Sequence, residues 1–469
     1  MAFHDAAFLS VFFPLFLLLD RLLPSLRWKN RLLILASLAF YTLGQWQGLP
    51  ILLLTALVSW AAGRFLAGHP GNRLVLAGAL AAELLLLAGF KYLDFFAGVL
   101  GLPPIVSGLG LAAPLGISFF TFKAMSYIID VFRGGTAATQ FSDNLLYLSF
   151  FPQVISGPIT RFGDFAPQLA DRSVTPERTA RGLRRFILGM GKKLLIASLA
   201  APVADAAFAL GADLDMRTAW LGAAAYAIQL YFDFSGYSDM AIGLGAVFGF
   251  DTPENFRYPY IALSLQDFWR RWHISLSQWF RDYLYIPLGG GRRGRGRKAV
   301  NTAAVFLLCG LWHGAAWTFL LWGAWHALFS ALESLGVIDC KRWARSGPGR
   351  VLCRVYTLLV VCLGFVIFRA ANPAQALAMF RGMFAGVRWT EASTLVLCRV
   401  SPASWLTLLA GIAGSTPLAP RLSAWAAGLE GGAGTLVRFC TWAGTLALFL
   451  LCLMAAAGGS FQPFIYGQF

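Results

Sequence analysis

The stretch Asn301–Phe329, NTAAVFLLCGLWHGAAWTFLLWGAWHALF, decides the fold class of this chain. It contains no Asp, Glu, Lys or Arg, and it is longer than the roughly 20 apolar residues that a membrane-spanning helix needs. Apolar stretches recur along all 469 residues, which are 58% hydrophobic and 13% charged. A soluble domain carries about twice that charged fraction. The sequence therefore predicts an all-α protein that crosses a membrane many times.

The apolar runs predict about eleven spans, because some runs are short enough to re-enter the membrane or to share one long helix. We treat residues 1–469 as a single membrane domain, since the chain shows no internal repeat and no soluble segment. The candidate spans lie near residues 7–23, 31–46, 49–67, 73–90, 111–131, 186–210, 218–235, 236–250, 300–315, 316–335, 351–369, 401–419 and 435–457.

The net charge of +16 sets the expected orientation. In a soluble protein this charge would suggest nucleic acid, but here Lys and Arg lie in short loops between apolar runs, as in cytoplasmic loops of membrane proteins. We therefore expect no nucleic-acid partner and an N-terminus outside the cytoplasm. The basic loops that we place in the cytoplasm are Arg21–Arg31, Arg64–Arg73, Arg172–Lys193, Arg292–Lys298 and Lys341–Arg354.

One apolar segment must not cross the membrane if this alternation is to hold. The segment Phe150–Ile159 (FFPQVISGPI) contains Pro152, Gly157 and Pro158, which break a helix. Irregular backbone at membrane depth is tolerated only where other helices bury it. We predict a re-entrant hairpin here.

The segment Asp267–Tyr283, DFWRRWHISLSQWFRDY, is neither a span nor a simple loop. On one helix its aromatic side chains fall within an arc of about 120°, opposite its Arg side chains. We predict a continuous amphipathic helix that lies in the membrane interface or lines a polar cavity. Asp267 and Arg271 would form an i, i+4 ion pair. His273, at the border of the two faces, either bonds a neighbouring helix or faces a polar channel.

His313 is an ionisable residue inside an apolar run. It follows Asn301 by 12 residues, or about 18 Å of helix, which is near the middle of a bilayer. Such a residue either hydrogen-bonds across a helix interface or serves a function in an internal cavity. No Ser-His-Asp, Cys-His or metal-ligand spacing accompanies it, so no metal ion is expected. We interpret His326, 13 residues further on, as a helix-packing histidine.

Five segments resemble the membrane-bound O-acyltransferase family, and within it the bacterial branch that acetylates alginate and peptidoglycan. The resemblance covers about residues 1–335, with a signature core at about 110–335. The segments are Pro114–Phe122 (PLGISFFTF), Phe150–Arg161 (FFPQVISGPITR), Asp233–Gly243 (DFSGYSDMAIG), Glu254–Gly290 and Gly310–Ala327.

The resemblance implies a helical fold around a central cavity in the bacterial inner membrane. It implies that His313, in W-H-G, is catalytic and that His273, in R-W-H-I-S, is the second functional position. The implied reaction moves an acyl group, expected to be acetyl, from a cytoplasmic donor such as acetyl-CoA toward hydroxyls of an extracytoplasmic polysaccharide. A periplasmic acyltransferase partner would complete the transfer. We expect no bound cofactor, because the acyl donor is a substrate.

Residues near the two histidines are the expected substrate contacts. The basic loop after Tyr285 (YIPLGGGRRGRGRK) lacks the G-K-[ST] ending of a phosphate-binding loop. Its charges either anchor the cytoplasmic face or attract the phosphates of the donor. The predicted substrate contacts are Trp269, Arg271, Asn255, Trp312 and Ser277, and the predicted donor-docking residues are Arg292, Arg293 and Arg295.

Two other functions stay open at this point. One is transfer of D-alanine to teichoic acid, in which a carrier protein replaces coenzyme A. The other is a transporter that carries out no chemistry, since broken helices and a polar site at the membrane midplane are also features of transporters.

Overall fold

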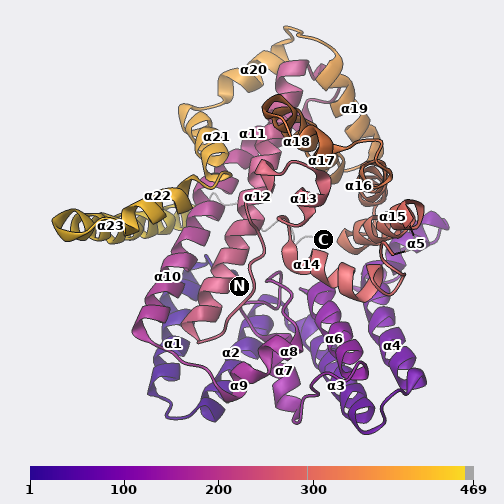
Figure 1. Cartoon of the computed structure of the whole chain (residues 1–469), viewed down its shortest axis with the longest axis vertical. Helices are drawn as coiled ribbons and strands as arrows, with labels where there is room; N and C mark the ends of the chain where they lie inside the picture. Colours follow the sequence, from indigo (N-terminus) through magenta and orange to yellow (C-terminus); the bar gives the residue numbers. More distant parts are fainter. Residues whose placement is uncertain (293, 460–469) are drawn as a thin grey trace. The chain divides into compact units, whose positions relative to one another are not determined.

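The structure is a computed structural model that describes residues 1–292 and 294–459 (Figure 1). Every regular element in these ranges is a helix, which confirms the all-α class. The chain forms two compact units. Unit 1 comprises Met1–Phe186 and Tyr237–Glu254, and unit 2 comprises Ile187–Gly236 and Asn255–Phe469. That the whole chain acts as a single domain stays a prediction.

Unit 1 is built from the N-terminal helices, which pack in neighbouring pairs. α6 packs against α3 and α4, and α7 packs against α2 and α3. The helices are η1 (Phe8–Phe12), α1 (Phe13–Leu22), α2 (Leu26–Gln45), η2 (Trp46–Gly48), α3 (Leu49–Gly68), α4 (Arg73–Lys91), α5 (Leu93–Val99), η3 (Ser107–Leu109), α6 (Ile117–Phe132), α7 (Phe141–Ser149), α8 (Phe162–Phe165), α9 (Pro167–Ala170) and most of α10 (Pro176–Gly191).

The predicted re-entrant segment forms no helix. Residues 151–157 fold as turns and a bend and are mostly buried in unit 1, so Pro152 and Gly157 lie in a segment without helix, as expected. That this segment re-enters the membrane without crossing it stays a prediction. Gly116 lies against it with a φ of +75°, and a Cβ atom on Gly116 would come within 2.2 Å of the Val154 carbonyl oxygen. Only glycine fits both that conformation and that contact.

Unit 2 contains the C-terminal helices. The two runs expected at 218–235 and 236–250 share one helix, α12 (Met216–Val247), which continues into unit 1. The others are η4 (Lys192–Ala197), α11 (Ser198–Ala209), η5 (Gly211–Asp213), η6 (Pro259–Ile261), α13 (Leu265–Trp269), α14 (Ile274–Phe280), η7 (Arg281–Tyr285), α15 (Gly294–His313), α16 (Trp317–Leu335), α17 (Cys340–Trp343), α18 (Gly347–Arg369), α19 (Pro373–Phe384), α20 (Glu391–Arg399), α21 (Pro402–Gly414), α22 (Leu418–Ala427) and α23 (Gly431–Ala457).

Length and composition identify five helical segments of the described chain that can cross a membrane. A sixth exists if the bent pair α20 and α21 counts as one span. The five are Leu26–Gly68, Arg73–Lys91, Pro176–Ala209, Gly347–Arg369 and Gly431–Ala457. The multi-pass character is thus supported, but the number of about eleven spans is not confirmed. Several expected spans are shorter or more polar: α6 has 16 residues, and α12 contains Asp233 and Asp239.

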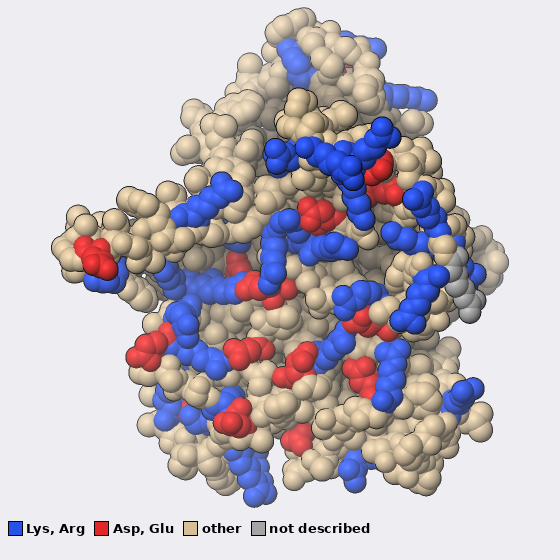
Figure 2. All heavy atoms as spheres, viewed as in Figure 1, with Lys and Arg blue, Asp and Glu red and all other residues tan. Residues whose placement is uncertain are grey.

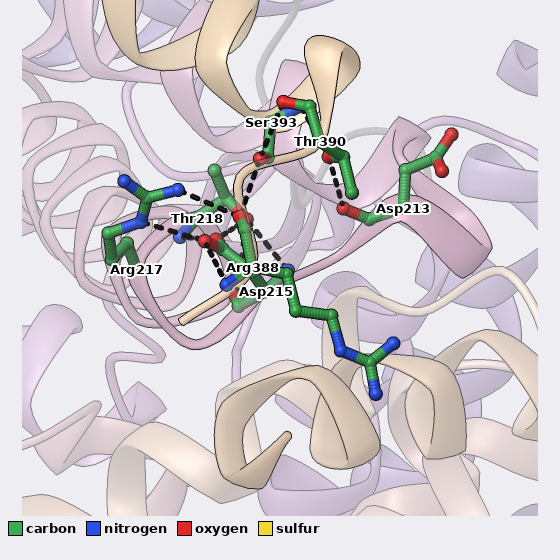
Figure 3. A network of polar contacts seen from close by, with 7 residues as sticks. All are labelled: Asp213, Asp215, Arg217, Thr218, Arg388, Thr390 and Ser393. Atoms are coloured by element: carbon green, nitrogen blue, oxygen red, sulfur yellow. Dashed lines mark hydrogen bonds and ion pairs between the residues drawn. The ribbon is translucent and has the colours of Figure 1, made fainter. Parts of the chain in front are cut away.

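Two polar clusters hold the part of α12 that belongs to unit 2, residues 216–236, one near each end of that part. Inside the unit, the Lys193 ammonium and the Asp233 carboxylate form a buried ion pair at 2.5 Å. At the start of α12, the Asp215 carboxylate accepts hydrogen bonds from the Thr218 amide at 2.9 Å and the Arg217 guanidinium at 2.7 Å (Figure 3). Arg217 also donates to the Arg388 carbonyl at 2.9 Å, which ties α12 to the segment before α20.

The helices α15 and α16 of unit 2 pack closely against each other, and glycine makes this possible. A Cβ on Gly310 would lie 2.4 Å from the Phe319 carbonyl oxygen, and a Cβ on Gly323 would lie 2.6 Å from the Phe306 carbonyl oxygen. Small residues at such contacts let two helices approach closely. Residues 314–316, directly after His313, connect the end of α15 to the start of α16.

The prediction of one continuous amphipathic helix over 267–283 is wrong, because the helix is interrupted just before Ile274, at His273. α13 ends at Trp269 and α14 begins at Ile274. His273 between them has a left-handed backbone with φ 43° and ψ 56°. The sequence pattern could not show this, since it assumes one helical period through the whole segment. The Asp267–Arg271 ion pair is nevertheless present, at 2.8 Å.

We predict that Gly323→Ala destabilises the protein by roughly 1–3 kcal/mol, because the added methyl overpacks the contact with α15. The matched control is Gly296→Ala, also in the α15–α16 pair but with open space around its Cβ position. There the substitution stabilises a helix by about 0.5–1 kcal/mol. Thermal unfolding of the detergent-purified variants measures both effects. Equal shifts of Tm in the same direction would contradict the close approach.

Candidate active site

Unit 2 encloses a cavity of about 860 Å³ that contains both predicted histidines. Its walls come from α13, α14, α15, α16 and the segment that includes α17. The side chains of His273 and His313 are 1% and 4% exposed, so they lie at its buried end. The cavity thus brings together two residues that are 40 positions apart in the sequence.

Asn255 holds His273 in its left-handed conformation. The Asn255 side-chain oxygen accepts hydrogen bonds from the Ser275 amide at 3.2 Å and the Ser275 hydroxyl at 3.0 Å. Its backbone carbonyl accepts a bond from the Ile274 amide at 3.0 Å. These bonds occupy amide groups that α13 and α14 would use if they were one helix. Left-handed residues other than glycine cost about 1–3 kcal/mol and need such support.

The same asparagine fixes the tautomer of His273. Nδ1 of the imidazole lies 3.2 Å from the Asn255 side-chain oxygen. Because the Ser275 amide can only donate, that atom is the acceptor oxygen of the amide, and Nδ1 must carry the hydrogen. Burial lowers the pKa of His273, so the ring is neutral. In this tautomer Nε2 carries the lone pair.

His313 sits at the last position of α15 among aromatic rings. Its ring centroid is 5.0 Å from that of Trp312, 5.1 Å from that of Trp322 and 5.1 Å from that of Phe368. The Trp312 ring also lies 6.2 Å from that of His273, so one indole contacts both imidazoles. An imidazole in such a position is a group that can accept a proton from a substrate hydroxyl.

The mouth of the cavity is basic. Seven Lys or Arg residues line the cavity against two acids, Glu333 and Asp339. All seven except Lys298 are exposed, so they lie toward the outer end. Figure 2 shows Lys and Arg side chains, interspersed with fewer Asp and Glu, across the face in view. The seven are Arg270, Arg281, Arg295, Lys298, Lys341, Arg342 and Arg345.

The described residues among those predicted from the sequence as substrate or donor contacts fall into three groups. Trp269, Ser277 and Arg295 line the cavity with the two histidines. Asn255 and Trp312 contact the histidines without lining the cavity. Arg271 and Arg292 do not line it; the Arg271 guanidinium bonds Asp267 and the Arg257 carbonyl, and Arg292 is exposed. Arg293 lies outside the described residues.

His326 packs behind the cavity wall, as the sequence predicts. It is 0% exposed, and its ring centroid lies 5.0 Å from those of both Trp269 and Trp322. Gly364 of α18 lies directly against it, because a Cβ there would come 2.8 Å from His326 Nε2. The imidazole thus fills a contact among three helices.

Sequence reasoning missed several lining residues. Arg270 lines the cavity although its neighbour Arg271 does not. The segment Lys341–Arg345 served only as a signal of membrane orientation, yet Lys341, Arg342 and Arg345 line the same cavity as Arg295 and Lys298 of α15. The available signal was that both clusters were expected on the same side of the membrane. Glu333 and Cys309 carried no signal, because each is a single residue on a helix.

The arrangement suits proton transfer beside an anionic substrate. Two buried imidazoles at the inner end are groups that can take up or deliver a proton. Positive side chains at the outer end attract a ligand with negative charge.

Comparison with known proteins gives one consistent result. The family model for the membrane-bound O-acyltransferase family matches residues 136–369. A protein of Azotobacter vinelandii named as a probable alginate O-acetylase is 40% identical over the full length of both chains. A Helicobacter pylori peptidoglycan O-acetyltransferase is 35% identical over 80% of this chain and 78% of its own. A Bacillus subtilis teichoic acid D-alanyltransferase is 31% identical over 54% of this chain and 68% of its own.

The matched region contains the two histidines, the cavity walls and the basic segments at the mouth. Full-length identity of 40% to a named relative extends the match beyond that region. The chain therefore belongs to the membrane-bound O-acyltransferase family, and it is an O-acyltransferase.

Proposed function

We propose that this enzyme transfers an acetyl group from a thioester donor to a hydroxyl group, with His313 as the general base. The observation that carries the proposal is that both buried imidazoles and the basic mouth belong to one cavity. A donor whose phosphates bind at the mouth can place its thioester at the imidazoles. The distance between mouth and base then sets the length of donor that fits.

The proposed reaction starts with deprotonation of the acceptor hydroxyl by His313. The alkoxide oxygen attacks the thioester carbonyl and forms a tetrahedral intermediate. Collapse of this intermediate breaks the C–S bond and releases a thiolate, which takes the proton back from His313. The products are an ester and a free thiol, and no proton is gained or lost. General base catalysis of this kind contributes typically about 10²–10⁴-fold to the rate.

His273, between α13 and α14, would assist His313 in this reaction. Its Nδ1 hydrogen is committed to Asn255, so its Nε2 lone pair is the group that can accept a hydrogen bond. In that role it orients the acceptor hydroxyl or takes part in proton movement. The Trp312 ring lies beside both imidazoles, with centroid distances of 6.2 Å to His273 and 5.0 Å to His313.

Coenzyme A is the donor that the mouth fits best. Its phosphates need several positive charges, and the seven basic lining residues exceed the two acids by five. Most of these residues lie in the two segments that the distribution of charge places in the cytoplasm, 292–298 and 341–354. Acetyl-CoA would therefore enter from the cytoplasmic side of a bacterial inner membrane.

The acceptor would be a polysaccharide outside the cytoplasm. The relatives named for alginate and peptidoglycan acetylation support a polymer rich in hydroxyl groups. A periplasmic acyltransferase partner would take the acetyl group to the polymer. A reactive group inside the membrane lets donor and acceptor meet without either crossing the whole bilayer.

Two alternatives have weaker support. D-Alanyl transfer has relatives that cover about half of this chain, whereas the acetylating relatives cover 80% to 100%. A donor-specificity assay with acetyl-CoA and a D-alanyl carrier protein separates the two. A transporter without chemistry would not require two buried imidazoles, and it is at odds with the family to which the chain belongs.

We predict that His313→Ala lowers the rate of acetyl transfer from labelled acetyl-CoA to polysaccharide by about 10²–10⁴-fold. The measurement uses membranes that contain the full chain at matched expression. His69→Ala is the control, because His69 is exposed and lies in unit 1. Wild-type activity in His313→Ala would overturn the mechanism.

We also predict that reversing charge at the mouth weakens donor binding. The double variant Lys341→Glu/Arg345→Glu should raise KM for acetyl-CoA by roughly 10- to 100-fold with little change in kcat, and added salt should shrink the difference. Arg350→Glu/Arg354→Glu is the matched control, since both residues are exposed in the same basic cluster but do not line the cavity. The same KM in both double variants would argue against donor docking at the mouth.

A further inference from the structure

Glu333 is an acid in a cavity whose mouth is basic. It lines the cavity together with seven Lys or Arg residues, and the only other acid among the lining residues is Asp339. A negative charge at this place works against binding of an anionic donor. Its presence therefore needs another explanation.

Both carboxylate oxygens of Glu333 bond the start of α13. The Leu265 amide donates to one oxygen at 2.8 Å, and the Gln266 amide donates to the other at 3.3 Å. The next amide, of Asp267, donates to the Ser264 hydroxyl at 3.1 Å. The first three amides of α13 thus have acceptors, and two of these are supplied by a residue of α16. Hydrogen bonds to a charged carboxylate are roughly twice as strong as neutral ones.

A helix of five residues depends on such external contacts. α13 is too short to be stable alone, because helix nucleation is costly. Its far end is fixed by Trp269, whose ring packs 5.3 Å from Phe306 of α15 and 5.7 Å from Trp322 of α16. The chain then passes through the turn to His273, which Asn255 holds. Glu333 therefore anchors the beginning of the segment that carries His273.

We propose that Glu333 is a positioning residue that sets His273 relative to His313. The carboxylate belongs to α16, and α16 packs along α15, which ends at His313. By bonding α13, the Glu333 carboxylate joins the segment that carries His273 to the α15–α16 pair, which carries His313. Glu333 itself touches neither reacting group. This inference rests on the proposed function for its effect on rate, but the anchoring itself does not.

The first test measures the anchoring without any reaction. In Glu333→Gln, one amide of α13 loses its acceptor, because the glutamine side chain presents NH₂ where the second oxygen stood. Hydrogen–deuterium exchange of the detergent-purified full chain should be about tenfold faster in peptides over 264–273, while peptides over α15 should stay unchanged. Unchanged exchange in 264–273 would overturn the anchoring role, whatever the enzyme's activity.

The second test is a double-mutant cycle on acetyl transfer from labelled acetyl-CoA. Glu333→Gln alone should lower kcat by roughly 10- to 100-fold through misplacement of His273, without raising KM for acetyl-CoA. In a His273→Ala background the same change should lower kcat less than about twofold, because both substitutions remove the same contribution, that of a correctly placed His273. Additive losses, or a raised KM with unchanged kcat, would contradict positioning through His273.

Glu391→Gln is the control for both tests. Glu391 is an exposed acid in the first turn of another short helix of unit 2, α20, and it does not line the cavity. It should leave both exchange over 264–273 and kcat unchanged. Absence of acetyl transfer in the wild type would count against the proposed function alone, because the exchange measurement still decides the role of Glu333.

Discussion

The candidate site depends on one constraint, the left-handed backbone of His273 that Asn255 supports. The bend ends α13 and starts α14, and it directs the imidazole into the cavity rather than along a helix face. Three bonds from Ile274 and Ser275 to Asn255 offset the conformational cost of about 1–3 kcal/mol. Backbone strain of this kind is concentrated at functional positions, where a specific side-chain direction is needed.

Polarity is distributed along the cavity in a physically consistent way. Positive side chains occupy the exposed mouth, where water can solvate them, and the two imidazoles occupy the buried end among aromatic rings. A charged base at the buried end would be costly, whereas a neutral imidazole is not. The acyl transfer that we propose needs a neutral base at the start and returns the base to neutrality at the end. The environment and the reaction therefore require the same protonation state.

Local patterns in the sequence predicted much of the architecture. Uninterrupted apolar runs such as Asn301–Phe329 made an all-α membrane protein the only reasonable class, and Pro152, Gly157 and Pro158 marked a segment that forms no helix. His313 stood out because an ionisable group in an apolar run is costly. Resemblance of the motifs around His273 and His313 then supplied the family, which the comparisons confirm.

The sequence by itself thus determined the helical membrane class and the family, and it predicted the two histidines as site residues, because these depend on composition and on short motifs. Only the tertiary structure decided that the helix over 267–283 breaks at His273, because the residue that holds the break, Asn255, lies 18 positions earlier. It also decided that Arg270, rather than Arg271, lines the cavity, and that Glu333 bonds α13 from 68 positions away. Such choices follow from contacts between distant segments, which no periodicity along the chain contains.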